Sequence, residues 1–312
     1  MVKNSSLITH HSSLLLRAPA KINWFLTVLG KREDGYHDIL SIMQCINLYD
    51  DLIFEHADTI EVVCNLDIPL EDNLIYKAVS LLKKYTSYRN GVKIILRKEI
   101  PVSAGLGGGS SDAAYTLRGI NMLWGLGLSN EELSSIGSEL SSDVPFFLNG
   151  PFAFVEGRGE RVTPLKTNSS VVLLLVKPPR SISTAWAYAS FDKAFGPSSG
   201  RGLRMDPESN RRSWLTKKTN NIKLFCHTLD RKNFVSLNTM LNNDLEKAVI
   251  ERYPVVGELK ERLIERGAVI SAMSGSGPTV FGVFYNRDTA EDAVKAIKPN
   301  WCRVVETMTS GA

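Results

Sequence analysis

The sequence is short of the features that mark several specialised classes of protein. Its four cysteines, Cys45, Cys64, Cys226 and Cys302, include no CxxC pair, which argues against the common zinc motifs and favours reduced thiols in a cytoplasm. No run approaches the roughly 20 apolar residues of a membrane helix. The net charge is only +4, from 37 basic and 33 acidic residues, which indicates neither nucleic acid nor a membrane surface as a partner.

We expect no secretory signal at the N-terminus. His10 to Ser13 interrupt the apolar stretch after Lys3, and Arg17 follows it, so residues 1–13 are interpreted as a frayed extension. The rest of the chain has the composition of an ordinary globular protein, with 43% apolar and 22% charged residues. A length of 312 residues suggests two domains, which we predict at 1–165 and 166–312.

Apolar spacing gives a mixed series of strands and helices with no internal repeat. Ser129 and Glu132 form a capping box, and Asp72 or Asn73 is expected to cap an earlier helix. The stretch 196–221, rich in Ser, Arg, Gly and Asn, is expected to be a mobile surface loop. Strands are expected at 14–17, 22–29, 59–64, 91–98, 171–176, 268–273, 280–284 and 303–306, a hairpin around 152–159, and helices at about 74–85, 111–123, 129–140, 184–191, 256–263 and 289–297.

The segment 101–114, PVSAGLGGGSSDAA, carries the strongest chemical signal. Glycine clusters where backbone takes positive φ or approaches a ligand closely. Ser110, Ser111 and Asp112 are residue types that cap a helix start, where partial positive charge attracts phosphate. The segment therefore predicts a phosphate cradle that opens a helix, the alternative being a tight strand-to-helix turn without a ligand.

Two familiar nucleotide motifs do not fit this segment. A Walker A loop needs Lys-Ser or Lys-Thr after its glycines, and none follows. The dinucleotide fingerprint needs a third glycine where this chain has Ser110, and a βαβ context with an acidic residue downstream is lacking. A dinucleotide oxidoreductase is therefore disfavoured.

Three segments together resemble the GHMP small-molecule kinases. They are the glycine segment, APAKIN at 18–23 followed by Gly35-Tyr36-His37, and MSGSGPT at 273–279. Within that superfamily the marks REDGYH at 32–37, SDVPFF at 142–147, GRGER at 157–161 and NDLE at 243–246 resemble the branch that phosphorylates a cytidyl diphosphate sugar alcohol. The resemblance covers about 17–284.

The resemblance implies an α+β fold of two domains, with a nucleotide and a small alcohol bound between them. The N-terminal domain would be like the second domain of ribosomal protein S5, and the C-terminal one a ferredoxin-like split β-α-β unit. ATP and Mg²⁺ are the implied cofactors, with Ser110 or Ser111 offering Mg²⁺ a hydroxyl and no dedicated protein metal site. The residues implied to bind ATP are Pro101, Val102, Ser103, Ala104, Gly105, Leu106, Gly107, Gly108, Gly109, Ser110 and Ser111.

Two residues are implied to be catalytic. Asp143 stands at a polar break before the apolar run 146–148, where a carboxylate would be poorly solvated unless paired. The resemblance makes it the general base, although a turn role is the ordinary interpretation of Asp before a Pro turn. Lys21 lies between Ala20 and Ile22, so alternation points it away from its apolar neighbours. The resemblance pairs it with Asp143 and the acceptor hydroxyl.

The implied substrate site contains an aromatic cage. Tyr36 and Tyr188 would stack on a nucleobase whose edge bonds to His37, an arrangement suited to a flat heterocycle. Asn23, two residues after Lys21, would face the same pocket. The loop Gly275-Ser276-Gly277 would contact substrate phosphates, unless it is a plain strand connection. Asp244 and Glu246 are interpreted as structural.

The expected partners are therefore small molecules, with no nucleic acid or membrane, and the chain is expected to be a cytoplasmic monomer or weak homodimer. Two rival functions stay open from the residues alone. One is a homoserine- or mevalonate-type kinase, against which Tyr36-His37 and the Gly-Arg-Gly-Glu segment argue. The other is a catalytically silent nucleotide-binding regulator, against which Lys21 and Asp143 argue.

Overall fold

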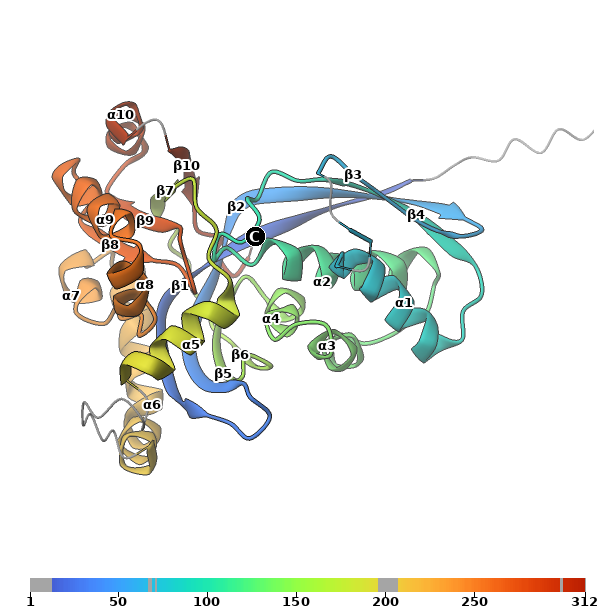
Figure 1. Ribbon diagram of the computed structural model, residues 1–312, viewed down its shortest axis with the longest axis horizontal. Coiled ribbons are helices and arrows are strands. Elements are labelled where there is room, and N and C mark those ends of the chain that lie inside the picture. Colours follow the sequence, from blue (N-terminus) through green and yellow to red (C-terminus); the bar gives the residue numbers. More distant parts are fainter. Residues whose placement is uncertain (1–12, 67–68, 71, 196–206, 298–299, 312) are drawn as a thin grey trace, which may run out of the picture.

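The strands form two separate sheets in the computed structural model, which describes residues 13–66, 69–70, 72–195, 207–297 and 300–311, the part 207–218 by its backbone alone (Figure 1). In the first sheet the order is β3-β4-β2-β5-β6, with β1 paired to β2, and only the β3–β4 pair is parallel. Its strands are β1 (Leu14–Lys31), β2 (His37–Ala57), β3 (Ile60–Cys64), β4 (Gly91–Arg97), β5 (Phe152–Gly157) and β6 (Arg161–Pro164).

The second sheet is fully antiparallel in the order β10-β7-β9-β8. Long connections join β7 to β8 and β9 to β10, which is the split β-α-β arrangement expected from the sequence. The α+β class is therefore confirmed. Its strands are β7 (Val172–Lys177), β8 (Ile270–Met273), β9 (Val280–Phe284) and β10 (Trp301–Glu306).

The two longest strands depart most from the prediction. β1 runs unbroken through Pro19. Proline has no N–H group to donate to the neighbouring strand, and the pairing with β2 shifts register between Pro19 and Ala20. β2 was not predicted at all, although Leu48, Asp50, Leu52 and Phe54 alternate onto one buried face. Asp50 interrupts the apolar pattern there, and its burial has a chemical reason described below.

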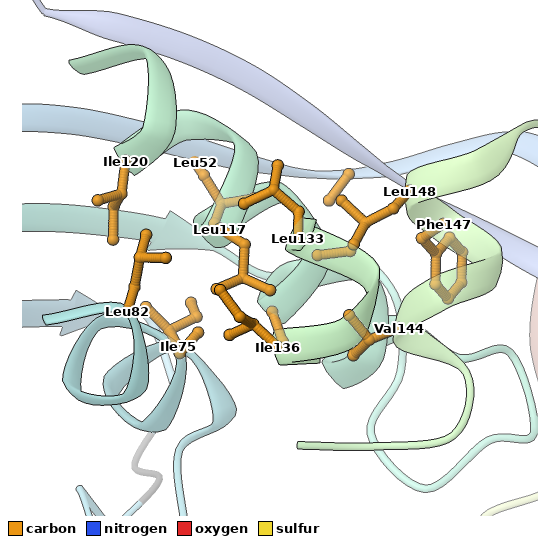
Figure 2. Close-up of a cluster of buried hydrophobic side chains, with 14 of the residues drawn as sticks. Leu52, Ile75, Leu82, Leu117, Ile120, Leu133, Ile136, Val144, Phe147 and Leu148 are labelled. Atoms are coloured by element: carbon orange, nitrogen blue, oxygen red, sulfur yellow. The ribbon is translucent and has the colours of Figure 1, made fainter. Parts of the chain in front are cut away.

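Four helices cover one face of the first sheet: α1 (Leu74–Thr86), α2 (Gly108–Leu123), α3 (Asn130–Ser138) and α4 (Val144–Asn149) (Figure 1). Figure 2 shows their side chains converging with Leu52 of β2. Leu117 and Ile120 of α2 are fully buried at the centre, each contributing about 1.5–3 kcal/mol of transfer free energy. Asn73 caps α1 and the Ser129–Glu132 box caps α3, as predicted.

The predicted loop at 196–221 is wrong for its second half. Residues from 207 onward belong to α6 (Pro207–Asp230), while 196–206 lie outside the described residues, as do 1–12 of the expected extension. α6 is anchored near its C-terminus, because Phe225 and Leu229 are buried and Phe225 packs edge-on against Trp24 of β1 at 6.2 Å. The polar composition of 207–221 gave no sign of a helix, because the buried residues Phe225 and Leu229 come after this stretch.

One apolar cluster joins the two sheets. Trp24 and Phe154 of the first sheet pack with Leu173 and Phe281 of the second. The domain division predicted at 165/166 falls between β6 and β7 and stays a prediction. The remaining helices are α5 (Thr184–Phe195), α7 (Phe234–Asn238), α8 (Glu246–Arg252), α9 (Val255–Glu265) and α10 (Arg287–Ile297). No helix in the described part of the chain is long and apolar enough to cross a membrane.

Candidate active site

The glycine segment forms a loop between β4 and α2. The helix begins at Gly108, three residues earlier than predicted, and its N-cap Gly107 has φ +71° and no side chain to cap with. The expected capping by Ser110, Ser111 and Asp112 is therefore wrong. Without a side-chain cap, the first backbone N–H groups of α2 stay available at the positive end of the helix dipole. The loop is a ready cradle for an anion.

Gly105 lets the loop approach the second sheet. Its φ is +77°, and a Cβ there would lie 2.2 Å from the carbonyl oxygen of Ser274. The Ser274 hydroxyl donates to the Gly105 carbonyl at 3.0 Å, and Lys21 N donates to the Leu106 carbonyl at 2.9 Å. All three sequence segments that carried the resemblance therefore meet at this loop.

Gly105→Ala is expected to lower both stability and activity. The added Cβ would have to displace the backbone of Ser274, and the alanine would have to adopt a positive φ. Gly125→Ala is the matched control, since Gly125 has φ +62° with no atom within 4 Å of a Cβ. The control should lose about 1–2 kcal/mol in free energy of unfolding, and Gly105→Ala more than this. Urea unfolding and ATP-binding titrations measure the difference. Equal losses of stability and of ATP affinity in the two variants would mean that the close approach at Gly105 matters for neither.

Lys21, Asn23 and Asp143 form a connected group. Lys21 Nζ lies 2.6 Å from Asn23 Oδ1 and 3.6 Å from Asp143 Oδ2. The Lys21 side chain is only 5% exposed and that of Asp143 28%. Asp143 occupies the N-cap position of α4, yet its carboxylate makes no capping bond. It is therefore left to face the lysine and the cavity that both residues line.

His37 and Tyr188 form the aromatic part of the site. Their rings stack at 4.8 Å with an interplanar angle of 24°, and His37 Nε2 lies 2.7 Å from Asp192 Oδ1. Tyr36 is 51% exposed, with the Arg158 guanidinium 5.0 Å from its ring centre.

The sequence did not indicate Asp192, and it marked Arg158 only as part of the GRGER segment, with no role at the site. Asp192 follows Tyr188 by four residues, so helical spacing of α5 was the available signal for it.

The loop after β8 closes the other side. Gly275 and Ser276 line the cavity, and Asn243 Nδ2 fixes the loop by donating to the Met273 and Gly275 carbonyls at 2.9 and 2.8 Å. Asp244 and Glu246 instead accept backbone N–H groups, from Val28 and Met273 respectively. Neither is among the described residues that line this cavity.

A buried trio of charges under the glycine loop was missed from the sequence. Lys98 Nζ donates to Asp50 Oδ2 and to Asp112 Oδ2, the latter at 2.7 Å. All three side chains are at most 5% exposed. Burial, with repulsion from Asp50, raises the pKa of Asp112 to about 7 despite the attraction of Lys98. Burial alone would lower the pKa of Lys98, but the attraction of the two carboxylates outweighs it and raises that pKa.

Asp112 should make stability depend on pH. Its pKa is about 7 in the folded protein and near 3.9 when unfolded, so the folded state binds more protons between pH 4 and 7. Its contribution to stability is therefore lost as pH rises through that window. Asp112→Asn cannot ionise and should gain stability relative to the original protein from pH 5 to pH 8. Urea unfolding at both values measures this, and parallel pH curves would contradict it.

A single cavity of about 1020 Å³ joins these groups. Of the predicted site residues, Leu106, Ser111 and Gly277 are not among the described residues that line it, and Leu106 and Ser111 are buried. The others do line it: Lys21, Asn23, Tyr36, His37, Pro101, Val102, Ser103, Ala104, Gly105, Gly107, Gly108, Gly109, Ser110, Asp143, Tyr188, Gly275 and Ser276.

A glycine loop at an uncapped helix start, facing a paired lysine and aspartate in one cavity, defines a small-molecule kinase. The GHMP kinase N-terminal model matches residues 73–151 and the GHMP kinase C-terminal model residues 223–303. The chain is 48% identical to the 4-diphosphocytidyl-2-C-methyl-D-erythritol kinase of Thermodesulfovibrio yellowstonii, over 95% of this chain and 98% of that one. It is 42% identical to the same-named protein of Geobacter metallireducens, over 91% and 94%.

A crystal structure of 4-(cytidine 5'-diphospho)-2C-methyl-D-erythritol kinase superposes with a TM-score of 0.75 at 29% identity, covering 94% of this chain and 99% of that one. Homoserine kinase from Cytophaga hutchinsonii reaches 0.69 at 18% identity, covering 96% of each chain, and shares the fold alone. The chain belongs to the GHMP kinase family and, within it, to the 4-diphosphocytidyl-2-C-methyl-D-erythritol kinases.

Proposed function

We propose that the protein transfers the γ-phosphate of ATP to the 2-hydroxyl of 4-diphosphocytidyl-2-C-methyl-D-erythritol, a step of non-mevalonate isoprenoid precursor synthesis. One observation carries the proposal: a single cavity reaches from the glycine loop, past Lys21 and Asp143, to the rings of His37 and Tyr188. A nucleotide at one end and a cytidyl group at the other would bring phosphate and hydroxyl together at the charged pair. The names of the relatives support that substrate.

The residues would divide the work as follows. The uncapped start of α2 and the loop 101–110 would hold the ATP phosphates through backbone N–H groups. Asp143 would accept the proton of the acceptor hydroxyl. Lys21, paired with that carboxylate, would stabilise the developing alkoxide, while Asn23 holds Lys21 in place. Tyr36, His37 and Tyr188 would bind the base, and the loop at 275–277 the substrate phosphates.

Mg²⁺ fits the donors at the loop. It prefers hard oxygen ligands and is usually bound by few protein groups together with nucleotide phosphates and water. The Ser110 hydroxyl lies 2.9 Å from that of Ser141 and lines the cavity with Asp143, so Ser110 is the proposed hydroxyl ligand. The bound ion would neutralise negative charge on the phosphates.

We place this reaction in the cytoplasm, carried out by a monomer or weak homodimer. No disulfide joins any two of the four cysteines, all of which lie in the described part of the chain. This supports a reducing compartment.

The test is ADP release with ATP and Mg²⁺ in the presence of the cytidyl substrate, mevalonate or homoserine. Turnover with the cytidyl substrate alone is the expected result. Turnover with another alcohol would mean that the protein is a kinase but acts on a different substrate. ATP binding without any turnover would point to a silent regulator and overturn the proposal.

A further inference from the structure

A hydrogen-bonded chain of three side chains lines the aromatic end of the cavity. Asp192 Oδ1 lies 2.7 Å from His37 Nε2, and Asp192 Oδ2 lies 3.0 Å from Lys31 Nζ. The His37 side chain is 7% exposed, and Tyr188 packs on its ring face. The proposed contact of His37 with a base explains neither Asp192 nor Lys31.

Asp192 decides which nitrogen of His37 carries a proton. Partial burial opposes ionisation of Asp192, but hydrogen bonds from His37 and Lys31 and the charge of Lys31 outweigh it and hold the pKa of Asp192 below its usual value. An ionised carboxylate only accepts hydrogen bonds, so His37 Nε2 must donate. Lys31 holds the second oxygen of the same carboxylate at 3.0 Å.

A neutral imidazole that is protonated at Nε2 has a lone pair at Nδ1. No partner for Nδ1 is found in the described part of the chain, and His37 lines the cavity. This ring therefore offers a ligand an acceptor. The 4-position of cytosine carries an amino donor, whereas that of uracil carries a carbonyl acceptor, and two facing acceptors repel.

We propose that Asp192 is a specificity-determining positioning residue, which fixes His37 as a hydrogen-bond acceptor so that the site takes a cytosine and rejects a uracil. This inference rests on the proposed function for the identity of the substrate. Lys31 takes part because it orients the carboxylate and holds its second oxygen. Asp192 acts through the histidine, to which it is bonded.

Asp192→Asn reverses the arrangement without changing its size. Lys31 can only donate and therefore takes the amide oxygen, which turns the NH₂ group toward His37 Nε2. That nitrogen then becomes the acceptor, and the proton moves to Nδ1.

With the cytidyl diphosphate substrate, kcat/KM should fall by about 10- to 100-fold, mainly through KM. With the uridyl diphosphate analogue it should hold or rise, so that the preference between the bases collapses.

A spectroscopic measurement separates this role from a structural one. In ¹⁵N-labelled protein without substrate, the ring nitrogen shifts of His37 should show a proton on Nε2 in the original chain and on Nδ1 in Asp192→Asn. A His37→Gln spectrum assigns the signals. Asp292→Asn is the matched control. Asp292 also pairs with a lysine, Lys295, but this pair is exposed on α10 and far along the chain from His37.

The outcomes are distinct. An equal loss on both substrates, or an unchanged tautomer in Asp192→Asn, overturns the inference while leaving the proposed function intact. If the original protein turns over neither substrate, the proposed function fails, and the tautomer measurement still decides what Asp192 does to His37. A collapsed base preference with a reversed tautomer supports the inference.

Discussion

Asp143→Asn is expected to lower kcat by about 10²- to 10⁴-fold, the usual contribution of a general base, while ATP still binds. The amide has nearly the same shape as the carboxylate but cannot take the proton of the acceptor hydroxyl. Asp143 makes no capping bond to α4, so the change should leave the helix intact. Single-turnover kinetics and ATP titration of the same protein separate the chemical step from binding.

The matched control is Asp288→Asn in the exposed first turn of α10, which should keep full activity. If Asp143→Asn retained kcat within a factor of a few, the acceptor hydroxyl would not need this base. Lys21 alone would then account for activation of the hydroxyl.

Lys98→Met should produce the largest loss of stability. It removes the only cation in the buried trio and leaves Asp50 and Asp112 without their shared donor. Breaking a buried ion pair from one side costs about 3–5 kcal/mol, and a second carboxylate adds to it. The urea midpoint of unfolding measures the loss. Because Lys98 Nζ would lie 3.1 Å from a Cβ on Gly108, ATP affinity should fall as well.

Two comparisons keep this prediction open to contradiction. Lys295→Met removes an exposed partner of Asp292 on α10 and should leave the midpoint almost unchanged. Adding Asp112→Asn to Lys98→Met should restore part of the lost stability, because one fewer carboxylate is left charged in the interior. A Lys98→Met protein as stable as the original would show that the trio is already neutralised by protonation.

The sequence was most informative where chemistry and local geometry coincide. The glycine loop, Lys21, Asn23 and Asp143 stand in short motifs, so their place in one cavity could be expected. Asp192 and Lys98 could not, because each acts on a residue brought near by folding: Asp192 on His37, 155 residues away, and Lys98 on Asp50, 48 residues away. Asp50 could not be placed either, because it interrupts the apolar face of β2, and that strand was not predicted.

The wrong helix start has a similar physical origin. Glycine is a poor helix former, so the sequence placed the beginning of α2 after the glycines. In the fold, Gly108 is held against Ile100 and Lys98, and this tertiary contact outweighs the local preference.

The contact between Gly105 and Ser274 joins residues 169 positions apart, and this has a consequence for synthesis of the protein on the ribosome. The segment 101–111 leaves the ribosome long before the 274–277 loop that covers it. Until then Gly105 lacks its neighbours, and the apolar surface around Trp24 lacks Phe225 and Phe281. The glycine segment of the nascent chain is therefore synthesised well before the cavity is complete. During that time the chain exposes an apolar surface that chaperones can recognise.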